Sequence, residues 1–124
     1  TNQNFVSIPH SYLINQIEYK AKKAGIKITI TEESYTSKCS FLDLELIKKH
    51  KEYLGKRVKR GLFRTSTNRH INADCNGSGN ILRKVIGDFE INDSIVRAAS
   101  APRIINVFEQ NALKSKNLLN FLTN

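Results

Sequence analysis

The feature that most constrains the fold is a stretch that reads as a short strand and continues directly into a helix. Residues 69–72 suit a strand, and beyond Asp74 four apolar side chains fall on one helical face: Ile81, Leu82, Val85 and Ile86. Arg83 and Lys84 occupy the opposite face, and Gly87 is a natural stop for the helix. The sequence therefore predicts a strand–helix junction with the carboxylate of Asp74 at the start of the helix.

Small residues fill the first turns of this predicted helix. Gly77, Ser78 and Gly79 disfavour a helix, since glycine in a helix interior costs roughly 1 kcal/mol relative to alanine. We attribute them to the close approach of another backbone or of nucleic acid.

A second helix and a strand are expected upstream. Residues 7–24 read as an amphipathic helix in which Pro9 suits the first turn and Gly25 the left-handed stop. Its apolar positions share one face: Leu13, Ile14, Ile17, Ala21 and Ala24. Residues 26–31 alternate apolar with polar and are rich in β-branched side chains, which predicts a strand with one buried face. A helix followed by a strand indicates an α/β fold.

The middle of the chain reads as an insertion between core elements. The pattern loosens over residues 41–62, which are rich in basic side chains. Residues 62–64 and 69–72 then predict a short hairpin, because the polar quartet 65–68 between them favours chain reversal.

Residues 88–124 are expected to form a C-terminal tail that is helical or poorly ordered. Residues 91–99 suit one or two turns of helix, Pro102 breaks the chain, and residues 111–122 are again compatible with a helix.

Positive charge is concentrated in one segment. The chain carries 20 Lys and Arg against 11 Asp and Glu, a net charge of +9. Residues 44–69 hold two acidic and nine basic side chains: Lys48, Lys49, Lys51, Lys56, Arg57, Lys59, Arg60, Arg64 and Arg69. A Lys-rich run is often only a solvated face, but Tyr53 and Phe63 are interleaved here and offer rings on which bases could stack. We therefore expect this segment to bind nucleic acid.

Size and cysteine content place the chain among intracellular proteins. A chain of 124 residues suits one domain with an appendage, and no apolar run approaches the ~20 residues that span a bilayer. Without a leader peptide, a cytoplasmic location and free thiols at Cys39 and Cys75 are expected. Because the chain opens on Thr1 and not on Met, we expect it to be a piece of a longer protein.

Asp74 has two competing explanations. An Asp before a helix is a common N-cap whose oxygen accepts an unpaired backbone N–H. In the other explanation the same carboxylate binds Mg²⁺, which prefers oxygen ligands and keeps several waters. Cleavage of a phosphodiester by two such ions requires further carboxylates nearby, so Asp74 is not sufficient alone.

Glu32 and Glu33 follow the predicted strand, and only one of them can point to the face of Ile28 and Ile30. Solvated charge explains both, yet strand ends are common active-site positions, so Glu33 is a second candidate metal ligand.

The sequence carries no motif of a zinc site, a phosphate-binding loop or a Ser/His/Asp catalytic site. The three His are far apart and Cys39 and Cys75 have no CxxC partner, so no zinc is expected. Neither a phosphate-binding glycine loop nor a local Ser/His/Asp arrangement is present.

Two ordered motifs resemble a known family. Glu33-Ser34-Tyr35-Thr36-Ser37-Lys38-Cys39-Ser40, followed by Ile71-Asn72-Ala73-Asp74-Cys75-Asn76-Gly77-Ser78-Gly79-Asn80-Ile81, is similar to the C-terminal part of TnpB, also called OrfB. These insertion-sequence proteins are related to type V CRISPR effectors and contain a RuvC-like nuclease of RNase H fold. Its third acidic motif reads approximately D-x-N-x-x-x-N-I, which four residues match: Asp74, Asn76, Asn80 and Ile81. The resemblance, over residues 5–87, implies that Asp74 is the last metal-binding carboxylate of that nuclease.

The chain departs from the family pattern in three places. Most members have a four-cysteine zinc ribbon between the two motifs, and here only Cys39 stands at a ribbon position. The insertion must then fold without zinc or stay mobile. Ala73 replaces an Arg that commonly precedes the Asp, and the first two acidic motifs of the family would lie upstream of Thr1.

The resulting prediction is a partial RNase H-like domain. Residues 1–40 and 63–87 would form its C-terminal RuvC-like segment, residues 41–62 the basic insertion, and residues 88–124 the tail. The chain would contribute Asp74 and the basic surface to Mg²⁺-dependent cleavage of DNA, together with the upstream RuvC half of the parent polypeptide, and would be inactive alone. The family resemblance adds a guide RNA as a further partner. Two alternatives stay open: a freestanding, non-catalytic nucleic-acid-binding module left over from a transposase, and a homo-oligomer that buries the apolar surface which the missing half would cover.

Overall fold

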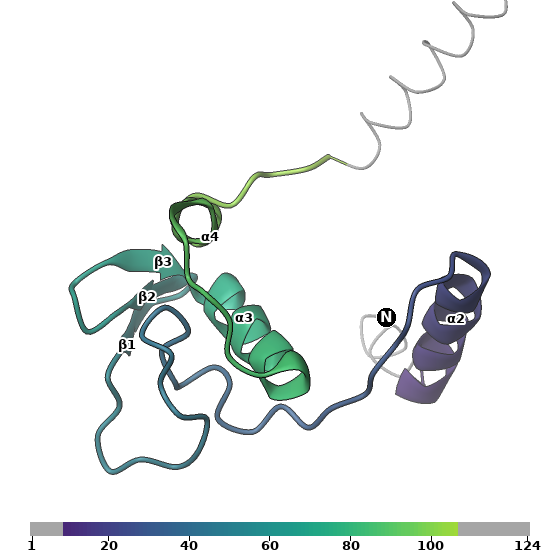
Figure 1. Cartoon of the computed structure of the whole chain (residues 1–124), viewed down its shortest axis with the longest axis horizontal. Helices are drawn as coiled ribbons and strands as arrows, with labels where there is room; N and C mark the ends of the chain where they lie inside the picture. The colour runs from purple at the N-terminus through teal and green to yellow at the C-terminus, as the bar shows by residue number, and fades with distance from the viewer. Residues whose placement is uncertain (1–8, 107–124) are drawn as a thin grey trace, which may run out of the picture. The chain divides into compact units, whose positions relative to one another are not determined.

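The computed structural model describes residues 9–106, which fall into two units separated after Glu32 (Figure 1). The first unit contains helix α2. The second contains a three-stranded sheet and two helices. The bounds of the elements are α2 His10–Lys23, β1 Lys56–Lys59, β2 Leu62–Arg64, β3 His70–Asn72, α3 Ala73–Ile86 and α4 Asp93–Ser100. The predicted α/β composition is thus confirmed within the described residues.

Helix α2 forms where the sequence predicts it. Pro9 is its N-cap and accepts the first backbone hydrogen bond, from Tyr12 N at 2.9 Å. The helix stops before Gly25, whose φ of 70° lies in the left-handed region that glycine adopts without strain. The apolar face stays open in this unit, with Leu13 53% and Ile17 51% exposed.

The strand predicted at residues 26–31 does not form. The segment has no regular structure, and Ile26 and Ile30 are 62% and 67% exposed. Alternation creates one apolar face, but a strand also requires a partner for its backbone N–H and C=O groups. Within residues 9–106 no strand pairs with this segment, so the prediction was wrong for the chain as described.

The sheet is an antiparallel meander in the order β1-β2-β3. The predicted hairpin is confirmed as β2 and β3, with Phe63 paired to Ile71. Asn68, at a φ of 61°, closes the turn by donating its N–H to Thr65 O at 3.1 Å. Strand β1 was not predicted, since residues 56–60 contain four cations and a single apolar residue.

The core of the second unit lies between the sheet and the two helices. Phe63, Ile71 and Ala99 are at most 4% exposed and form one cluster. Gly55 packs against the ring of Phe63 so closely that a Cβ at this position would collide with the ring. The sheet contacts α3 through β2 and β3, and α4 through β3.

Helix α3 has the predicted end but turns a different face inward. Gly87, at a φ of 82°, ends it as expected. Its buried residues, however, are mostly polar: Asn76, Gly79, Asn80 and Arg83. The predicted apolar face is open, with Leu82 47% and Ile86 61% exposed. The polar face turns inward because its side chains bond to the backbone of the loop.

The small residues of α3 admit an aromatic ring. A Cβ at Gly79 would lie 2.6 Å from the ring of Phe41, whereas one at Gly77 would meet nothing within 4 Å. Close approach was correctly inferred at Gly79, but the approaching group is a side chain and not the backbone or nucleic acid that we expected.

The short helix expected in residues 91–99 is confirmed as α4. The side chain of Asn92 caps it by accepting the N–H of Ile95 at 3.0 Å, and Pro102 follows its C-cap, Ala101. The helix expected at residues 111–122 lies outside the described residues. No helix within residues 9–106 has the length and apolar character that crossing a membrane requires.

Candidate nucleic-acid and metal site

Asp74 does not cap α3. The N-cap is Asn72, whose Oδ1 accepts the N–H groups of Asp74 at 2.9 Å and of Cys75 at 3.0 Å. Asp74 stands in the first turn and is exposed. Among the described residues no hydrogen bond or ion pair engages its carboxylate. The capping explanation of Asp74 is therefore wrong, and the carboxylate is available to a ligand.

Asp74 lines a pocket of about 300 Å³. Glu33, the other candidate ligand, lines the same pocket although it is 41 positions earlier in the chain. Arg57 of the basic segment also lines it. The complete lining is Glu33, Thr36, Ser37, Arg57, Ala73, Asp74, Gly77, Ser78 and Ile81. The fold thus brings together the two predicted acidic residues and one predicted phosphate-binding residue.

The register of the sheet explains why Arg57 reaches this pocket. Arg57 of β1 pairs with Phe63 of β2, which in turn pairs with Ile71 of β3. Directly paired residues of an antiparallel sheet point to the same face, so Arg57 shares the face of the two core residues, against which α3 packs. Lys56 pairs with Arg64 and belongs to the opposite face.

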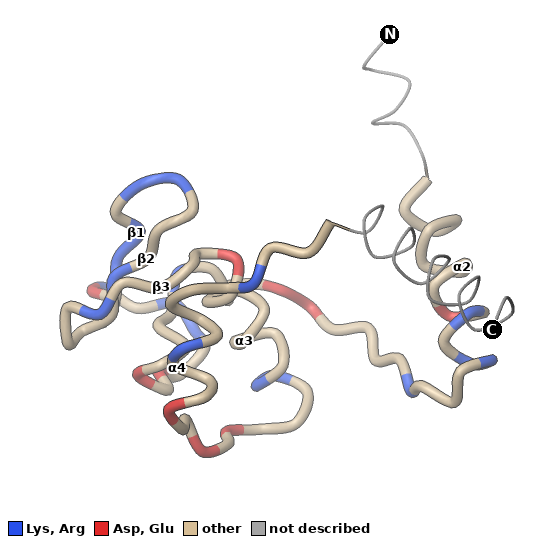
Figure 2. Tube along the Cα trace, turned by 90° about the horizontal axis from the view of Figure 1, so that it is seen from above, with Lys and Arg blue, Asp and Glu red and all other residues tan. Residues whose placement is uncertain are grey.

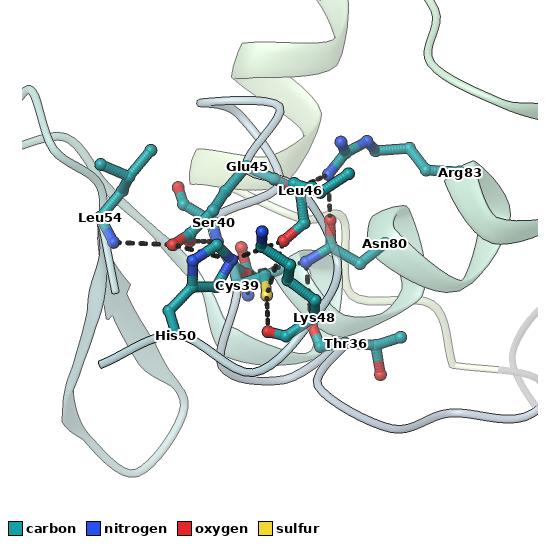
Figure 3. Close-up of polar contacts among 11 residues, drawn as sticks. Thr36, Cys39, Ser40, Glu45, Leu46, Lys48, His50, Leu54, Asn80 and Arg83 are labelled. Carbon is teal, nitrogen blue, oxygen red and sulfur yellow. Dashed lines mark hydrogen bonds and ion pairs between the residues drawn. The ribbon is translucent and has the colours of Figure 1, made fainter. Parts of the chain in front are cut away.

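Two amide side chains of α3 bind the segment that carries Glu33. Asn80 Nδ2 donates to Thr36 O at 2.9 Å and to Cys39 O at 2.8 Å (Figure 3). Asn76 Nδ2 also donates to Cys39 O, at 2.9 Å, and its Oδ1 accepts the N–H of Phe41 at 2.8 Å. Both amides are fully buried. The Asn residues of the second motif therefore hold the first motif against α3.

The same loop fixes Glu33 itself. The carbonyl of Glu33 accepts the N–H of Thr36 at 3.2 Å and its hydroxyl at 2.7 Å. Since Thr36 is in turn held by Asn80, the backbone at Glu33 is tied to α3 through two hydrogen-bonded residues.

Arg83 extends this network to the basic insertion. Its guanidinium donates to Asn80 Oδ1 at 2.8 Å, to Glu45 O at 2.9 Å and to Asp88 Oδ1 at 2.8 Å. The sequence places Arg83 on the face opposite to the apolar side chains, and in the structure Arg83 is 5% exposed. A buried, charged donor with three acceptors is a strong local constraint.

The hydrogen bonds of one buried carboxylate, that of Glu45, hold the first half of the insertion in place. Glu45 Oε2 accepts the N–H of Ser40 at 2.7 Å, and Oε1 accepts that of Leu54 at 3.0 Å (Figure 3). His50 Nε2 lies 3.8 Å from Oε1. Glu45 is 4% exposed. Its two oxygens join the segment before the insertion to the residue that precedes Gly55.

Cys39, at the ribbon position, is turned into this loop. Its Sγ lies 3.6 Å from the carbonyl oxygens of Leu46 and Lys48. Burial raises the pKa of the thiol, opposed in part by the Lys48 hydrogen bond. No group of three or more His, Cys, Asp or Glu side chains suited to a metal ion occurs within residues 9–106.

A second carboxylate connects the insertion to the hairpin turn. Asp43 accepts the N–H of Ser66 at 2.9 Å and its hydroxyl at 2.6 Å. Burial alone would raise the pKa of Asp43, but the hydroxyl of Ser40 and the two groups of Ser66 favour the carboxylate, and the pKa is lowered.

All nine predicted phosphate-binding side chains are exposed. Figure 2 shows that Lys and Arg gather around β1, whereas acidic residues lie on the chain that leads to α4. Lys38 was missed as a member of this surface, although its charge and its place in the first motif were visible in the sequence. The hydrogen bond between Arg83 and Glu45 O had no signal there, since the two residues are 38 positions apart in the chain.

A comparison with protein families supports the resemblance seen in the sequence. The family described as "Cas12f1-like, TNB domain" matches residues 10–81, from the start of α2 to the last residue of the second motif. No curated protein and no solved structure matches the chain. Because the matched region covers more than half of the sequence, the chain belongs to the Cas12f1-like TNB domain family and is related to TnpB and Cas12f proteins.

Proposed function

We propose that the chain is a nucleic-acid-binding segment from the C-terminal part of a TnpB-type protein, where it supplies Asp74 to a Mg²⁺-dependent, RuvC-like DNA endonuclease. The observation that carries the proposal is the pocket that joins Asp74 and Glu33 to Arg57 of the basic surface. A metal-dependent nuclease requires carboxylates next to a site for the phosphate backbone. This pocket offers both.

The donors at the pocket suit Mg²⁺. Two acidic residues, Asp74 and Glu33, and two serines, Ser37 and Ser78, are among the residues that line it. Mg²⁺ takes oxygen ligands, is usually held by one or two carboxylates and keeps several waters. The ion would polarise a phosphoryl oxygen and activate water. Arg57 would hold the phosphate beside it.

The basic surface gives the segment its affinity for polyanions. Nine exposed cations lie in residues 44–69, and Lys38 adds a tenth nearby charge. Contacts of this kind with phosphates release counterions and make binding dependent on salt. The substrate is a DNA strand, held with or without a guide RNA.

The rest of the nuclease would cover the open apolar face of α3. Leu82, Val85 and Ile86 are 41% to 61% exposed, and contiguous apolar surface of this kind marks an interaction site. The upstream RuvC half of the parent polypeptide, with the remaining acidic residues of the site, is the proposed occupant.

Replacing Asp74 by Asn tests the metal role. In the full-length parent, Asp74→Asn should lower Mg²⁺-dependent DNA cleavage by more than the ~10–100-fold typical of outer-sphere partners, because a direct ligand is lost. DNA binding by the 124-residue chain should persist. Asp93→Asn is the matched control, since Asp93 also stands in the first turn of a helix with an Asn cap. Unchanged cleavage by Asp74→Asn would sink the catalytic proposal.

A binding module without cleavage is the second candidate. The observation that favours it is that, among the described residues, two acidic residues line the pocket and no group of three or more metal ligands occurs. Weaker DNA binding by the Arg57→Ala chain, combined with cleavage by the full-length parent that Asp74→Asn leaves unchanged, would show that this segment binds DNA without taking part in cleavage.

A further inference from the structure

A second pocket of about 420 Å³ adjoins the one at Asp74, and Ser37 and Arg57 line both. Its remaining lining residues are Lys38, Tyr53, Gly55, Lys56 and Phe63. Two basic residues that are not on the far face of the sheet, Lys38 and Arg57, and two aromatic residues, Tyr53 and Phe63, therefore line one space.

The floor of this pocket is preformed. Phe63 is 1% exposed and is held in the core, and the absence of a side chain at Gly55 leaves the backbone in contact with its ring. Any larger residue at Gly55 would collide with Phe63 and with Arg64 O, at 2.8 Å. The floor is thus flat and belongs to the rigid sheet.

Tyr53 forms a partly exposed wall whose ring is positioned by its neighbours. His50 meets it edge to face, with 5.3 Å between ring centroids and an interplanar angle of 71°. Lys38 Nζ lies 6.0 Å from the centroid of the Tyr53 ring, within reach of a cation–π contact. An aromatic ring and a cation are therefore presented together.

We propose that this pocket binds one unpaired nucleotide, with its base stacked on Tyr53 and its phosphate held by Lys38 and Arg57. Rings interleaved with cations are the means by which proteins hold single strands, because every base has a face that stacks. A base within a duplex is already stacked and paired, so the pocket favours an unpaired strand. The inference rests on the proposed nucleic-acid binding and adds the kind of strand that the site takes.

Arg57 connects this pocket to the proposed cleavage site. Since its side chain lines both pockets, a strand whose base occupies the first would present an adjacent phosphate to Asp74 and Glu33. Tyr53 is then a positioning residue for the strand and does not touch the reacting atoms.

The test compares the 124-residue chain with Tyr53→Ala and Tyr53→Phe by fluorescence anisotropy. The probes are a labelled oligothymidylate, an abasic strand of equal length and a duplex of equal length. Tyr53→Ala should weaken binding to oligothymidylate by about 10-fold, as expected for one lost stacking contact, and Tyr53→Phe should restore it. Affinity for the abasic strand should be the same in all three proteins.

Tyr19→Ala is the matched control, because Tyr19 also lies under a lysine, with Lys23 Nζ 4.8 Å from its ring centroid on α2. It should leave every affinity unchanged. Equal binding of oligothymidylate and abasic strand by the unmodified chain would overturn the inference but keep the proposed function. Failure to bind any of the three probes would overturn both.

A direct readout covers the case in which Tyr53→Ala does not fold. An oligonucleotide with 5-iodouracil, irradiated in complex with the unmodified chain, should crosslink to Tyr53, and mass spectrometry locates the adduct. Crosslinks found only at residues outside the pocket would contradict the proposal.

Discussion

At the scale of single residues, the carboxylates of this chain differ in role because they accept different hydrogen bonds. Asp43 and Glu45 accept backbone N–H groups and hold loops, whereas Asp74 has its N–H capped by Asn72 and keeps its oxygens open. The sequence predicted Asp74 and Glu33 as a pair because they belong to motifs. The sequence could not decide whether Asp74 is a helix cap or a metal ligand, since the answer depends on which nearby side chain occupies the N-cap position of α3.

Asp43 makes stability depend on pH. Its pKa is lower in the folded chain than its ordinary value of 3.8, so its contribution is complete above that value and is lost as the pH falls through the lower folded pKa. Asp43→Asn should therefore flatten the decline of the melting temperature below about pH 4. Ser66→Ala, which removes one of the two Ser66 hydrogen bonds, should have an intermediate effect. Circular dichroism melts between about pH 2 and pH 6 measure this, and identical profiles for all three proteins would contradict it.

At the scale of elements, the limits of sequence reading follow from contacts between distant residues. The C-terminal end of α3 and the β2–β3 turn are local properties of Gly87 and Asn68 and were predicted correctly. The strand predicted at 26–31 does not form, and the polar face that α3 buries had no signal in the sequence. Both depend on what lies opposite: a partner strand in the first case, and carbonyl groups of the loop in the second.

Glu45 should be the most sensitive residue of the insertion. Glu45→Gln replaces one of two buried acceptors by an NH₂ group that faces another donor, which leaves a backbone N–H unpaired and should cost about 1–3 kcal/mol of unfolding free energy. Glu52→Gln, at an exposed position in the same segment, should change it by no more than about 0.5 kcal/mol. Urea denaturation gives both values. Equal effects of the two substitutions would show that the Glu45 hydrogen bonds do not hold the loop.

At the scale of the whole molecule, charge is separated along the chain. Residues 44–69 hold nine of the 20 cations, and acidic residues follow α3. The nucleic-acid surface was predictable from this distribution alone. Its connection to Asp74 was not, because it depends on the pairing of β1 with β2.

Salt dependence measures how many cations contact phosphate. For the 124-residue chain and a labelled single strand, Arg57→Ala should reduce the slope of log K against log salt by about 1, since one phosphate contact is lost. Arg97→Ala removes an exposed charge from α4 and should leave the slope unchanged. Anisotropy titrations at several salt concentrations give the slopes. Equal slopes for the two variants would place Arg57 outside the binding surface.

The cap that Asn72 provides has a consequence for the evolution of the site. Because another residue already satisfies the first N–H groups of α3, selection for folding alone leaves position 74 nearly free to drift. Relatives that have lost cleavage should therefore retain Asn72 and vary at position 74, and those that cut should retain both. Variation at position 72 then reports selection for folding, and variation at position 74 reports selection for cleavage.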